Sequence, residues 1–337
     1  NNCGMSDKNK TPEAVNQFLE DKQTIAEKEV YETPEGWVSA YELYKRKTKD
    51  YDYLIDDLFL KSGISTVYGV EDTGKSQLAL FLLLSVVSGK DFLGLKINAK
   101  HKRALLITTE DQEEDVAVRL NNMVDNSDYL AENLSRIDTR YTAKDITKSL
   151  EDYIKTRKVD LVVIDCFGDI FPHDMKMLNH TRVWLQDFYE LTTKHKFHLM
   201  FVHHSKKDSE DKLPHKSNCS GVGLTAKGRT AIEFRKDPED LDKRHICIVK
   251  ANFLSEEKKQ DSIEIKFDHG NFIKTGNKQF DMLLVSKDEK DILQNNVLEM
   301  KNKGKNQDEI AEKLDLKQYQ VSRILKRAKH QEKYSEK

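Results

Sequence analysis

The stretch Gly69-Val-Glu-Asp-Thr-Gly-Lys75-Ser76 fits the pattern G-x-x-x-x-G-K-[ST] and governs how the rest of the sequence is interpreted. An apolar run, Ile64–Tyr68, precedes it and an amphipathic run, Gln77–Leu84, follows it. A loop of this kind between a strand and a helix binds phosphate, because successive backbone amides and the positive end of the helix face the anion. A chance Gly-Lys-Ser in a loop is the alternative, which the two correct flanks disfavour. The stretch therefore predicts a nucleotide-binding domain.

Within this loop the residue types have distinct expected tasks. We expect Lys75 to reach the β- and γ-phosphates and the hydroxyl of Ser76 to ligate Mg²⁺. The glycines permit a tight turn and a close approach of the backbone to phosphate. The predicted nucleotide-binding residues are Gly69, Glu71, Asp72, Thr73, Gly74, Lys75, Ser76 and Gln77.

Length and composition indicate a chain with a large core and one or two appendages. The 337 residues exceed one average domain, and 34% of them are charged although the net charge is only −2. The sequence has no run of 18 apolar residues and shows no secretory signal, so we expect no membrane partner. Cys3, Cys166, Cys219 and Cys247 lack C-x-x-C spacing, which is typical of free thiols in a reducing cytoplasm.

Apolar strands alternate with helical patterns from Leu54 to about Gly276, which predicts an α/β fold with a mostly parallel sheet and helices on both faces. Two later strands, His245–Ala251 and Ser262–Phe267, are expected to form an antiparallel hairpin at the edge, continued by Asn271–Lys274. The predicted parallel strands are Ile64–Tyr68, Ala104–Thr109, Val159–Ile164, Phe197–Val202 and Arg229–Phe234, and the predicted helices are Gln77–Ser88, Glu113–Val124, Asp145–Thr156 and Thr181–Lys194.

The segments on either side of this core, residues 51–276, differ from it in pattern. Residues 1–50 are predicted to form a helical arm, with helices at Pro12–Tyr31 and near Val38–Arg46, that is either a disordered leader or docks on a neighbour. Residues 277–288 are expected to be a linker and residues 289–332 a small all-α domain of the helix-turn-helix or winged-helix kind. Its two short helices share one apolar face, made of Ile310, Ala311, Leu314, Leu316, Val321, Ile324 and Leu325.

Carboxylates end two of the predicted strands. The apolar run Leu161-Val-Val-Ile-Asp165 predicts that Asp165 holds the Mg²⁺ shell, as a Walker B residue does, and an ordinary acidic strand end is the alternative. After Ala104-Leu-Leu-Ile-Thr-Thr come Glu110 and Asp111. We assign Glu110 the task of orienting and polarising the attacking water, with Asp111 as the second choice and a solvated strand end as the alternative.

A pair of histidines ends the next strand, in Phe197-His-Leu-Met-Phe-Val-His203-His204. Successive side chains of a strand point to opposite faces, so only one of them is expected to face the site. That residue could contact the γ-phosphate or the catalytic water and sense hydrolysis. Metal binding is the competing idea, disfavoured because no Cys or carboxylate lies at metal-ligand spacing in the sequence.

These motifs, taken in order with Val202-His-His-Ser-Lys206 and Lys250-Ala-Asn-Phe253, resemble those of plasmid RepA-type hexameric helicases, among the RecA/DnaB-like P-loop ATPases of the AAA_25 kind. The resemblance covers about Leu54 to Ile273. It implies a RecA-like core, ATP and Mg²⁺ as cofactors, a homo-oligomeric ring, usually of six subunits, with ATP between neighbours, and single-stranded DNA in a central channel. The C-terminal helix-turn-helix is an addition to that pattern.

The resemblance also assigns residues to catalysis. It implies Lys75 and Ser76 on phosphate and Mg²⁺, Glu110 as the catalytic carboxylate, His204 as the sensor, and Lys250 reaching the γ-phosphate of a neighbouring subunit. Position 252, where DnaB-type helicases carry an arginine finger, is Asn, and no arginine stands at the place that RepA-type proteins use, near Cys219–Gly223. The remaining candidates for a cation supplied in trans are Lys216, Lys227 and Arg229.

Two parts of the chain are candidates for DNA contact. The loops Phe167–His180 and Ser205–Gly223 would face the channel, and Lys206 and Lys207 lie in the second, although interspersed acids also fit a solvated loop. Phe167 and Phe171 are the aromatic residues of these loops that could stack on bases. On the last helix, duplex contacts are expected from Gln318, Gln320, Arg323 and Lys326, and a protein-docking module is the alternative.

Two functions remain open at this stage. The first is an ATP-driven DNA motor, a RepA-like helicase or replication ATPase of a mobile element. The second is a nucleotide-switched DNA-binding regulator or loader with slow hydrolysis, which the missing arginine favours. A P-loop kinase of a small metabolite is weaker, because no phosphoacceptor site is recognisable and the helix-turn-helix would be unexplained.

Overall fold

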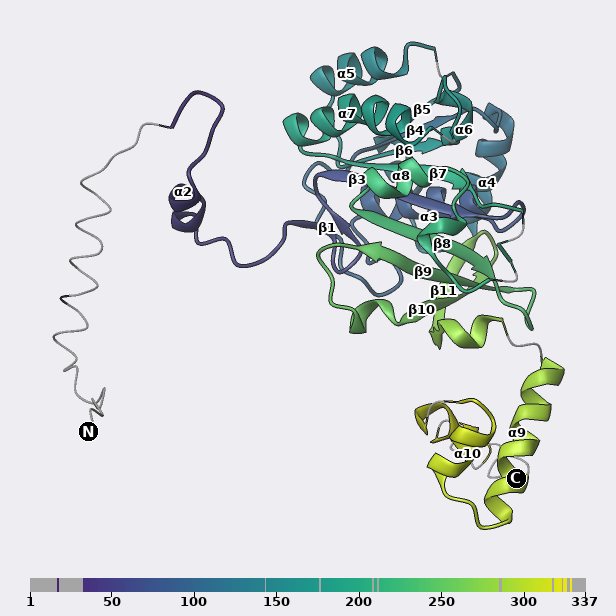
Figure 1. Cartoon of the computed structure of the whole chain (residues 1–337). Coiled ribbons are helices and arrows are strands. Elements are labelled where there is room, and N and C mark those ends of the chain that lie inside the picture. The colour runs from purple at the N-terminus through teal and green to yellow at the C-terminus, as the bar shows by residue number, and fades with distance from the viewer. Residues whose placement is uncertain are drawn as a thin grey trace, which may run out of the picture. The chain divides into compact units, whose positions relative to one another are not determined.

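A computed structural model describes most of the chain (Figure 1). It describes residues 33–142, 144–175, 177–207, 209–210, 212–284, 287–316, 318–322 and 324–325, with Gln17 and Ala328. The predicted helix Pro12–Tyr31 lies outside these residues except for Gln17. The chain divides into two units, Asn1–Tyr51 and Asp52–Lys337.

The first unit contains one short described helix, α2 (Ala40–Lys45), within the predicted range. Ser39 and Glu42 form a capping box at its N-terminus, in which the Ser39 hydroxyl accepts from the Glu42 amide at 3.1 Å. No residue of α2 is buried, and Trp37 before it is 74% exposed.

The second unit is built on a nine-stranded sheet in the order β11-β10-β9-β8-β3-β7-β6-β4-β5. The strands from β8 to β5 in this order run parallel, and β9, β10 and β11 are added antiparallel at one edge. The strands are β3 (Gly63–Gly69), β4 (Ala104–Thr108), β5 (Ile137–Arg140), β6 (Leu161–Asp165), β7 (His198–His204), β8 (Thr230–Lys236), β9 (Lys243–Ala251), β10 (Asp261–Asp268) and β11 (Asn271–Gln279). This is the mostly parallel α/β sheet that the alternating pattern predicts.

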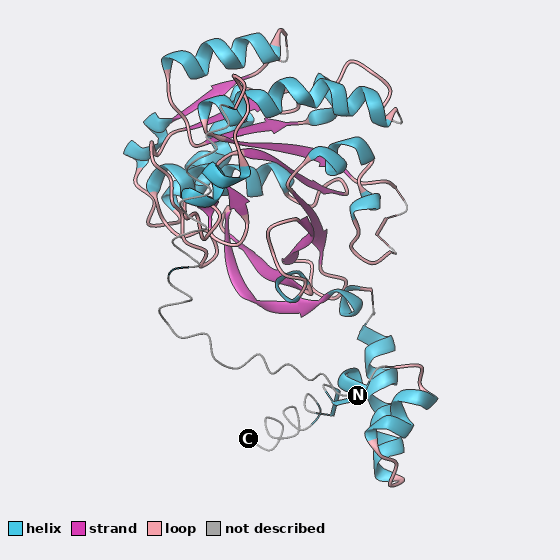
Figure 2. Cartoon of the chain, turned by 60° about the vertical axis from the view of Figure 1, so that its left-hand side comes forward, coloured by secondary structure: helices cyan, strands magenta, loops and turns pink. Residues whose placement is uncertain are grey.

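Helices cover both faces of the sheet, as Figures 1 and 2 show. On one face α3 (Lys75–Ser88) and α4 (Glu113–Asp125) pack with inward residues such as Val67 and Leu106. On the other, α5 (Ile146–Thr156), α7 (Leu178–His195) and α8 (Val222–Lys227) pack with their sequence neighbours such as Leu105 and Ile107. Because both faces are covered, the central strands are buried along their whole length, which explains their continuous apolar sequence.

Several elements were not predicted from the sequence because they are short or polar. These are β1 (Tyr53–Ile55), β2 (Phe59–Leu60), β5, α6 (Phe167–Ile170), α8, and the 3₁₀ turns η1 (Ala131–Arg136), η2 (Lys216–Asn218), η3 (Glu257–Lys259) and η4 (Phe280–Leu283).

The predicted linker 277–288 needs a correction at its start. Strand β11 continues to Gln279, and η4 follows with Leu283 only 4% exposed. The polar residue Lys278 has partners across the sheet. Its ammonium group pairs with the buried Asp237 at 2.7 Å, and its backbone carbonyl accepts from the Ser262 hydroxyl at 2.9 Å. Residues 277–283 therefore belong to the edge of the sheet.

The C-terminal residues form their own apolar cluster. Helix α9 (Lys287–Asn302) contributes Val297 and Met300, and helix α10 (Gln307–Lys313) begins at a capping box between Asn306 and Glu309. The seven residues of the predicted apolar face all lie in this cluster. Among the described residues, no helix has the length and the apolar character needed to cross a membrane.

Candidate functional site

The phosphate-binding loop joins β3 to α3. It contains two glycines, and each position requires glycine for a different physical reason. A Cβ on Gly69 would lie 2.2 Å from the Phe234 carbonyl of the neighbouring strand β8, so no larger residue fits. Gly74 has φ of 91° and stands at the N-cap of α3, where a left-handed backbone favours glycine. The free amides of the first turn of α3 thus face the interior of the loop, as phosphate binding requires.

Lys75 folds over the loop that precedes it. Its ammonium group donates to the carbonyl of Val70 at 2.8 Å, and Thr73 also donates to that carbonyl. Burial lowers the pKa of Lys75, and the nearby carboxylates of Asp165 and Glu110 oppose this shift. Lys75 is therefore a largely buried cation that faces two carboxylates, the environment expected for a phosphate ligand.

Ser76 and Asp165 lie close together although 89 positions separate them in the sequence. The Ser76 hydroxyl donates a hydrogen bond to the Asp165 carboxylate, which is buried at the end of β6. Burial raises the pKa of Asp165 to about 6, and the hydrogen bond from Ser76 acts in the opposite direction. A hydroxyl and a carboxylate at the foot of the loop match the hard oxygen ligands that Mg²⁺ prefers.

Of the two neighbouring carboxylates, Asp111 is held by hydrogen bonds from Arg119, whereas Glu110 is available for catalysis. The guanidinium of Arg119 on α4 makes two hydrogen bonds to Asp111, at 2.6 and 2.8 Å. Glu110 instead faces the site, 41% exposed. Partial burial acts to raise the pKa of Glu110, but hydrogen bonds from His204 and Cys166 prevail and lower it. Of the two carboxylates considered in the sequence, the geometry favours Glu110.

The two histidines at the end of β7 do point to different surroundings. Nε2 of His204 lies 3.1 Å from Oε1 of Glu110, while His203 is buried and contacts the Ser220 hydroxyl at 2.7 Å. Burial lowers the pKa of His203 to about 4, so it is neutral at pH 7. Parallel pairing explains the convergence, because Gly69 is level with His204 across β3 and β7, and Thr108 is level with Asp165 across β4 and β6.

Sequence spacing disfavours metal binding by these histidines, but the fold brings a cysteine and a carboxylate close to His204. Ligand atoms of Glu110, Cys166 and His204 all lie within 4.8 Å of one another. The spacing rule failed because it considers neighbours in sequence, whereas these three residues come from the ends of three adjacent strands.

Lys250 has structural partners within its own chain. Its ammonium group donates to the carbonyls of Thr225, Ala226 and Gly228, at 2.9, 2.8 and 2.7 Å, and so caps the C-terminus of α8. Burial lowers the pKa of Lys250, and the charges of Lys216 and Arg229 lower it further. The structure therefore places a basic cluster here and holds Lys250 at α8.

Two contacts at the loop were not foreseen. The guanidinium of Arg244 on β9 donates to the Thr73 carbonyl at 2.9 Å, and Gln77 on α3 donates to the carbonyl of Gly270, in the turn between β10 and β11. The antiparallel edge strands thus support the phosphate-binding loop. No local signal in the sequence pairs these distant positions.

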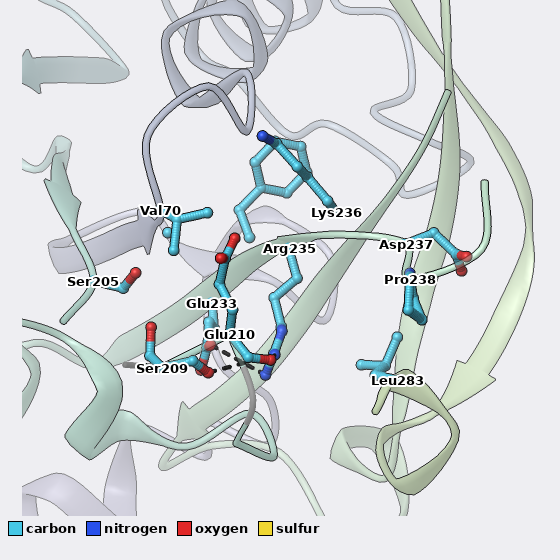
Figure 3. A pocket seen from close by; sticks show the side chains of 12 residues that line it. Val70, Ser205, Ser209, Glu210, Glu233, Arg235, Lys236, Asp237, Pro238 and Leu283 are labelled. Carbon is cyan, nitrogen blue, oxygen red and sulfur yellow. Dashed lines mark hydrogen bonds and ion pairs between the residues drawn. The ribbon is translucent and has the colours of Figure 1, made fainter. Parts of the chain in front are cut away.

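The segment Ser205–Gly223 is held from beneath by a buried ion pair on β8. Glu233 and Arg235 lie 3.4 Å apart, and Arg235 donates to the backbone carbonyls of Ser209 and Glu210 (Figure 3). Arg235 also donates to the carbonyl of Lys212. Glu233 accepts from the His215 amide at 3.0 Å and from Asn218 at 2.9 Å. The side chains of Glu233 and Arg235 help line a cavity of about 160 Å³ beside Gly69. Lys206 and Lys207 are exposed on the same segment.

The aromatic residues of the other candidate DNA loop are not available for stacking on bases. Phe167 and Phe171 are 0% and 6% exposed, and their rings stack on each other at 5.3 Å within the core. The apolar face formed by α7 and β7 explains their burial. Near the C-terminus, Gln318 and Tyr319 are exposed and Gln320 is half-buried, while Arg323 and Lys326 lie outside the described residues.

Two of three comparisons with known proteins found a match. Residues 31–210 match the family model AAA_25, described as an AAA domain. A solved structure, the RadB recombinase, is similar at 18% identity and a TM-score of 0.47, over 63% of this chain and 90% of that one. The search of curated proteins finds no match. Since the family model covers more than half of the chain, the protein belongs to the AAA_25 family of AAA domains.

Proposed function

We propose that this chain hydrolyses ATP with Mg²⁺ and uses the cycle to act on DNA as a ring-forming motor of the RepA-like helicase or replication type. The observation that carries the proposal is the convergence of Lys75, Ser76, Glu110, Asp165 and His204 at the carboxyl edge of adjacent parallel strands. In open α/β sheets, ligands bind at this edge.

The assigned roles follow from the positions of these side chains. Backbone amides at the start of α3 and Lys75 would hold the phosphates, and Ser76 with Asp165 would hold Mg²⁺, which neutralises charge on the β- and γ-phosphates when bound. Glu110 would orient the attacking water and accept its proton. His204, in contact with Glu110, would report the state of the γ-phosphate to the segment that begins at Ser205.

DNA contact is proposed on two surfaces. Lys206 and Lys207 are exposed directly after the strand that carries His204, so movement of that strand end would move these cations. The small C-terminal domain would bind duplex DNA through the helix that bears Gln318 and Gln320. Phosphate contacts of this kind weaken steeply as salt increases.

A second function, a nucleotide-switched DNA regulator or loader with slow turnover, is favoured by one observation. Lys250, the residue expected to reach a neighbour's γ-phosphate, already donates to three carbonyls of its own chain. The remaining candidates near it are Lys216 and Arg229, whose charges act on Lys250. Absence of a cation supplied in trans lowers phosphoryl-transfer rates by about 10³-fold or more.

The discriminating experiment combines ATP turnover, assembly and strand separation. Hydrolysis is measured with and without single-stranded DNA, mass with and without ATP, and unwinding on a forked duplex, with Lys75→Ala as the inactive control. DNA-stimulated hydrolysis by rings that separate the fork supports the motor. Duplex binding that responds to ATP without unwinding supports the switch, and unchanged nucleotide affinity in Lys75→Ala contradicts both.

A further inference from the structure

Three side chains with different donor atoms converge beside the phosphate-binding loop. Glu110 follows β4, Cys166 follows β6, and His204 ends β7. Their donor atoms lie within 4.8 Å of one another, and the Glu110–His204 pair is 3.1 Å apart. Cys166 is 2% exposed and forms the floor of this group, while the side chains of Glu110 and His204 are 41% and 35% exposed and lie at its rim. The side chains of Glu110 and His204 are therefore partly open to solvent, and Cys166 supplies a buried third donor.

The donor set is that of zinc rather than magnesium. Zn²⁺ binds thiolate, imidazole and carboxylate at about 2.0–2.3 Å, most often in tetrahedral geometry, which separates donor atoms by roughly 3.5 Å. Because the donor atoms all lie within 4.8 Å of one another, each pair would need to close by about 1.3 Å at most to reach this geometry. Mg²⁺ prefers oxygen ligands, such as those of Ser76 and Asp165, whereas thiolate and imidazole select softer metals. Three protein ligands leave one position open to water or a phosphate oxygen.

The imidazole of His204 can adopt the required tautomer without losing another contact. Nε2 faces Glu110, and Nδ1 has no hydrogen-bond partner among the described residues. A proton can thus reside on Nδ1 while Nε2 binds metal. The thiol of Cys166, which donates to Glu110, would release its proton to solvent as the metal–sulfur bond forms.

We propose that Glu110, Cys166 and His204 form a zinc site that inhibits the chain. Metal binding at this site is independent of the proposed ATPase function, but the inhibition rests on it. Zinc would take the carboxylate oxygen of Glu110 that orients the attacking water and the imidazole nitrogen of His204 that contacts Glu110. The bound metal would then compete with catalysis directly and not through the Mg²⁺ ligands.

The site itself is tested with cobalt, which reports its ligands by absorption. The full-length protein carries Cys3→Ser, so that the thiol of Cys3 cannot bind the metal. It is titrated with Co²⁺ in the presence of excess Mg²⁺ and without nucleotide. We expect an ultraviolet thiolate-to-cobalt band that Zn²⁺ abolishes. The band should vanish in Cys166→Ser, weaken in His204→Ala, and persist in Cys219→Ser, which removes a buried thiol elsewhere. Asp237, His245 and Glu264 also cluster, but that group contains no thiol.

The affinity change gives the second measurement. Zn²⁺ binding by calorimetry should fall about 100-fold or more in Cys166→Ser, beyond the 10- to 100-fold typical of losing an outer-shell partner. A thiolate band that survives Cys166→Ser, or no band in the parent protein, overturns the site.

Inhibition is measured on the same proteins. The zinc concentration that halves each variant's own ATP hydrolysis should match the parent in Cys219→Ser and rise about 100-fold in Cys166→Ser. Full hydrolysis at zinc concentrations that saturate the site overturns the inhibitory role. A protein that shows the thiolate band but never hydrolyses ATP refutes the proposed function and leaves the metal site standing.

Discussion

Oε1 of Glu110 lies 3.1 Å from Nε2 of His204, a contact that joins the ends of β4 and β7. The neighbouring carboxylate, Asp111, is held by two hydrogen bonds from Arg119. We therefore predict that Glu110→Gln keeps nucleotide affinity but loses about 10²- to 10⁴-fold in ATP hydrolysis, because the amide cannot accept the proton from water. Steady-state hydrolysis and equilibrium nucleotide binding check this prediction.

The matched control is Asp111→Asn, which removes the ion pair to Arg119 and leaves Glu110 intact. It should retain hydrolysis within a few-fold of the parent and lose about 1 kcal/mol of stability, since the pair is partly exposed. A larger loss of hydrolysis in Asp111→Asn than in Glu110→Gln would transfer the catalytic assignment to Asp111.

Mg²⁺-dependent nucleotide affinity should fall as pH decreases through about 6. Burial raises the pKa of Asp165 to about 6, so below that pH its neutral form predominates, and the metal needs the ionised form. Affinity for Mg²⁺–nucleotide should then approach a tenfold decrease per pH unit, while affinity measured without Mg²⁺ changes less. Titrations between pH 5 and 8 test the slope. Asp165→Asn should bind weakly at every pH, and a pH profile like that of the parent would refute the assignment.

Lys250→Met should destabilise the core in the absence of nucleotide. The mutation removes three hydrogen bonds to carbonyls at the end of α8, and the two part-buried acceptors, the carbonyls of Thr225 and Gly228, would keep their desolvation cost. We expect a loss of about 2 kcal/mol in the free energy of unfolding by urea. Lys274→Met, at an exposed position of β11, is the matched control and should change stability little. Equal stability of both variants would mean that Lys250 does not cap α8.

Arg235→Met should loosen the segment Ser205–Gly223. The guanidinium supports three backbone carbonyls and pairs with Glu233, which is 2% exposed (Figure 3). Removing one partner of a buried ion pair costs about 3–5 kcal/mol, because the other charge is left unpaired. Trypsin should then cleave faster after Lys206 and Lys207. Lys236→Met, at the exposed next position, should leave cleavage unchanged, and slow cleavage in both variants would contradict the role of Arg235.

Most of the parallel core was predictable because strands such as β4 and β6 are continuous apolar runs. Strand β5, which pairs parallel with β4, was not predicted because it is short and polar. Asp165 and Glu110 were found because a carboxylate after such a run is a local signal. The convergence of strand ends then follows from parallel pairing alone.

The features that sequence reasoning missed depend on contacts between distant segments. The engagement of Asp111 requires the position of Arg119 on α4, and the capping role of Lys250 requires α8, a helix too short to give a periodic pattern. The sequence prediction ended β11 too early, because the polar residues of this strand have their partners across the sheet. Cys166 joins Glu110 and His204 only after three strands have aligned.

Removing the residues after Leu284 should separate DNA binding from the ATPase core. The cut keeps η4, whose Leu283 is buried, and lies before α9 and its separate apolar cluster. We expect hydrolysis to be retained and affinity for random-sequence duplex to fall about tenfold, which corresponds to about 1.4 kcal/mol. In the full chain, Gln318→Ala should lower duplex affinity in the same direction. A cut after Gly276 is the contrasting variant, because it removes the end of β11 and Leu283 and should lower stability. Duplex binding that is equal before and after the Leu284 cut would identify the C-terminal domain as a protein-docking module.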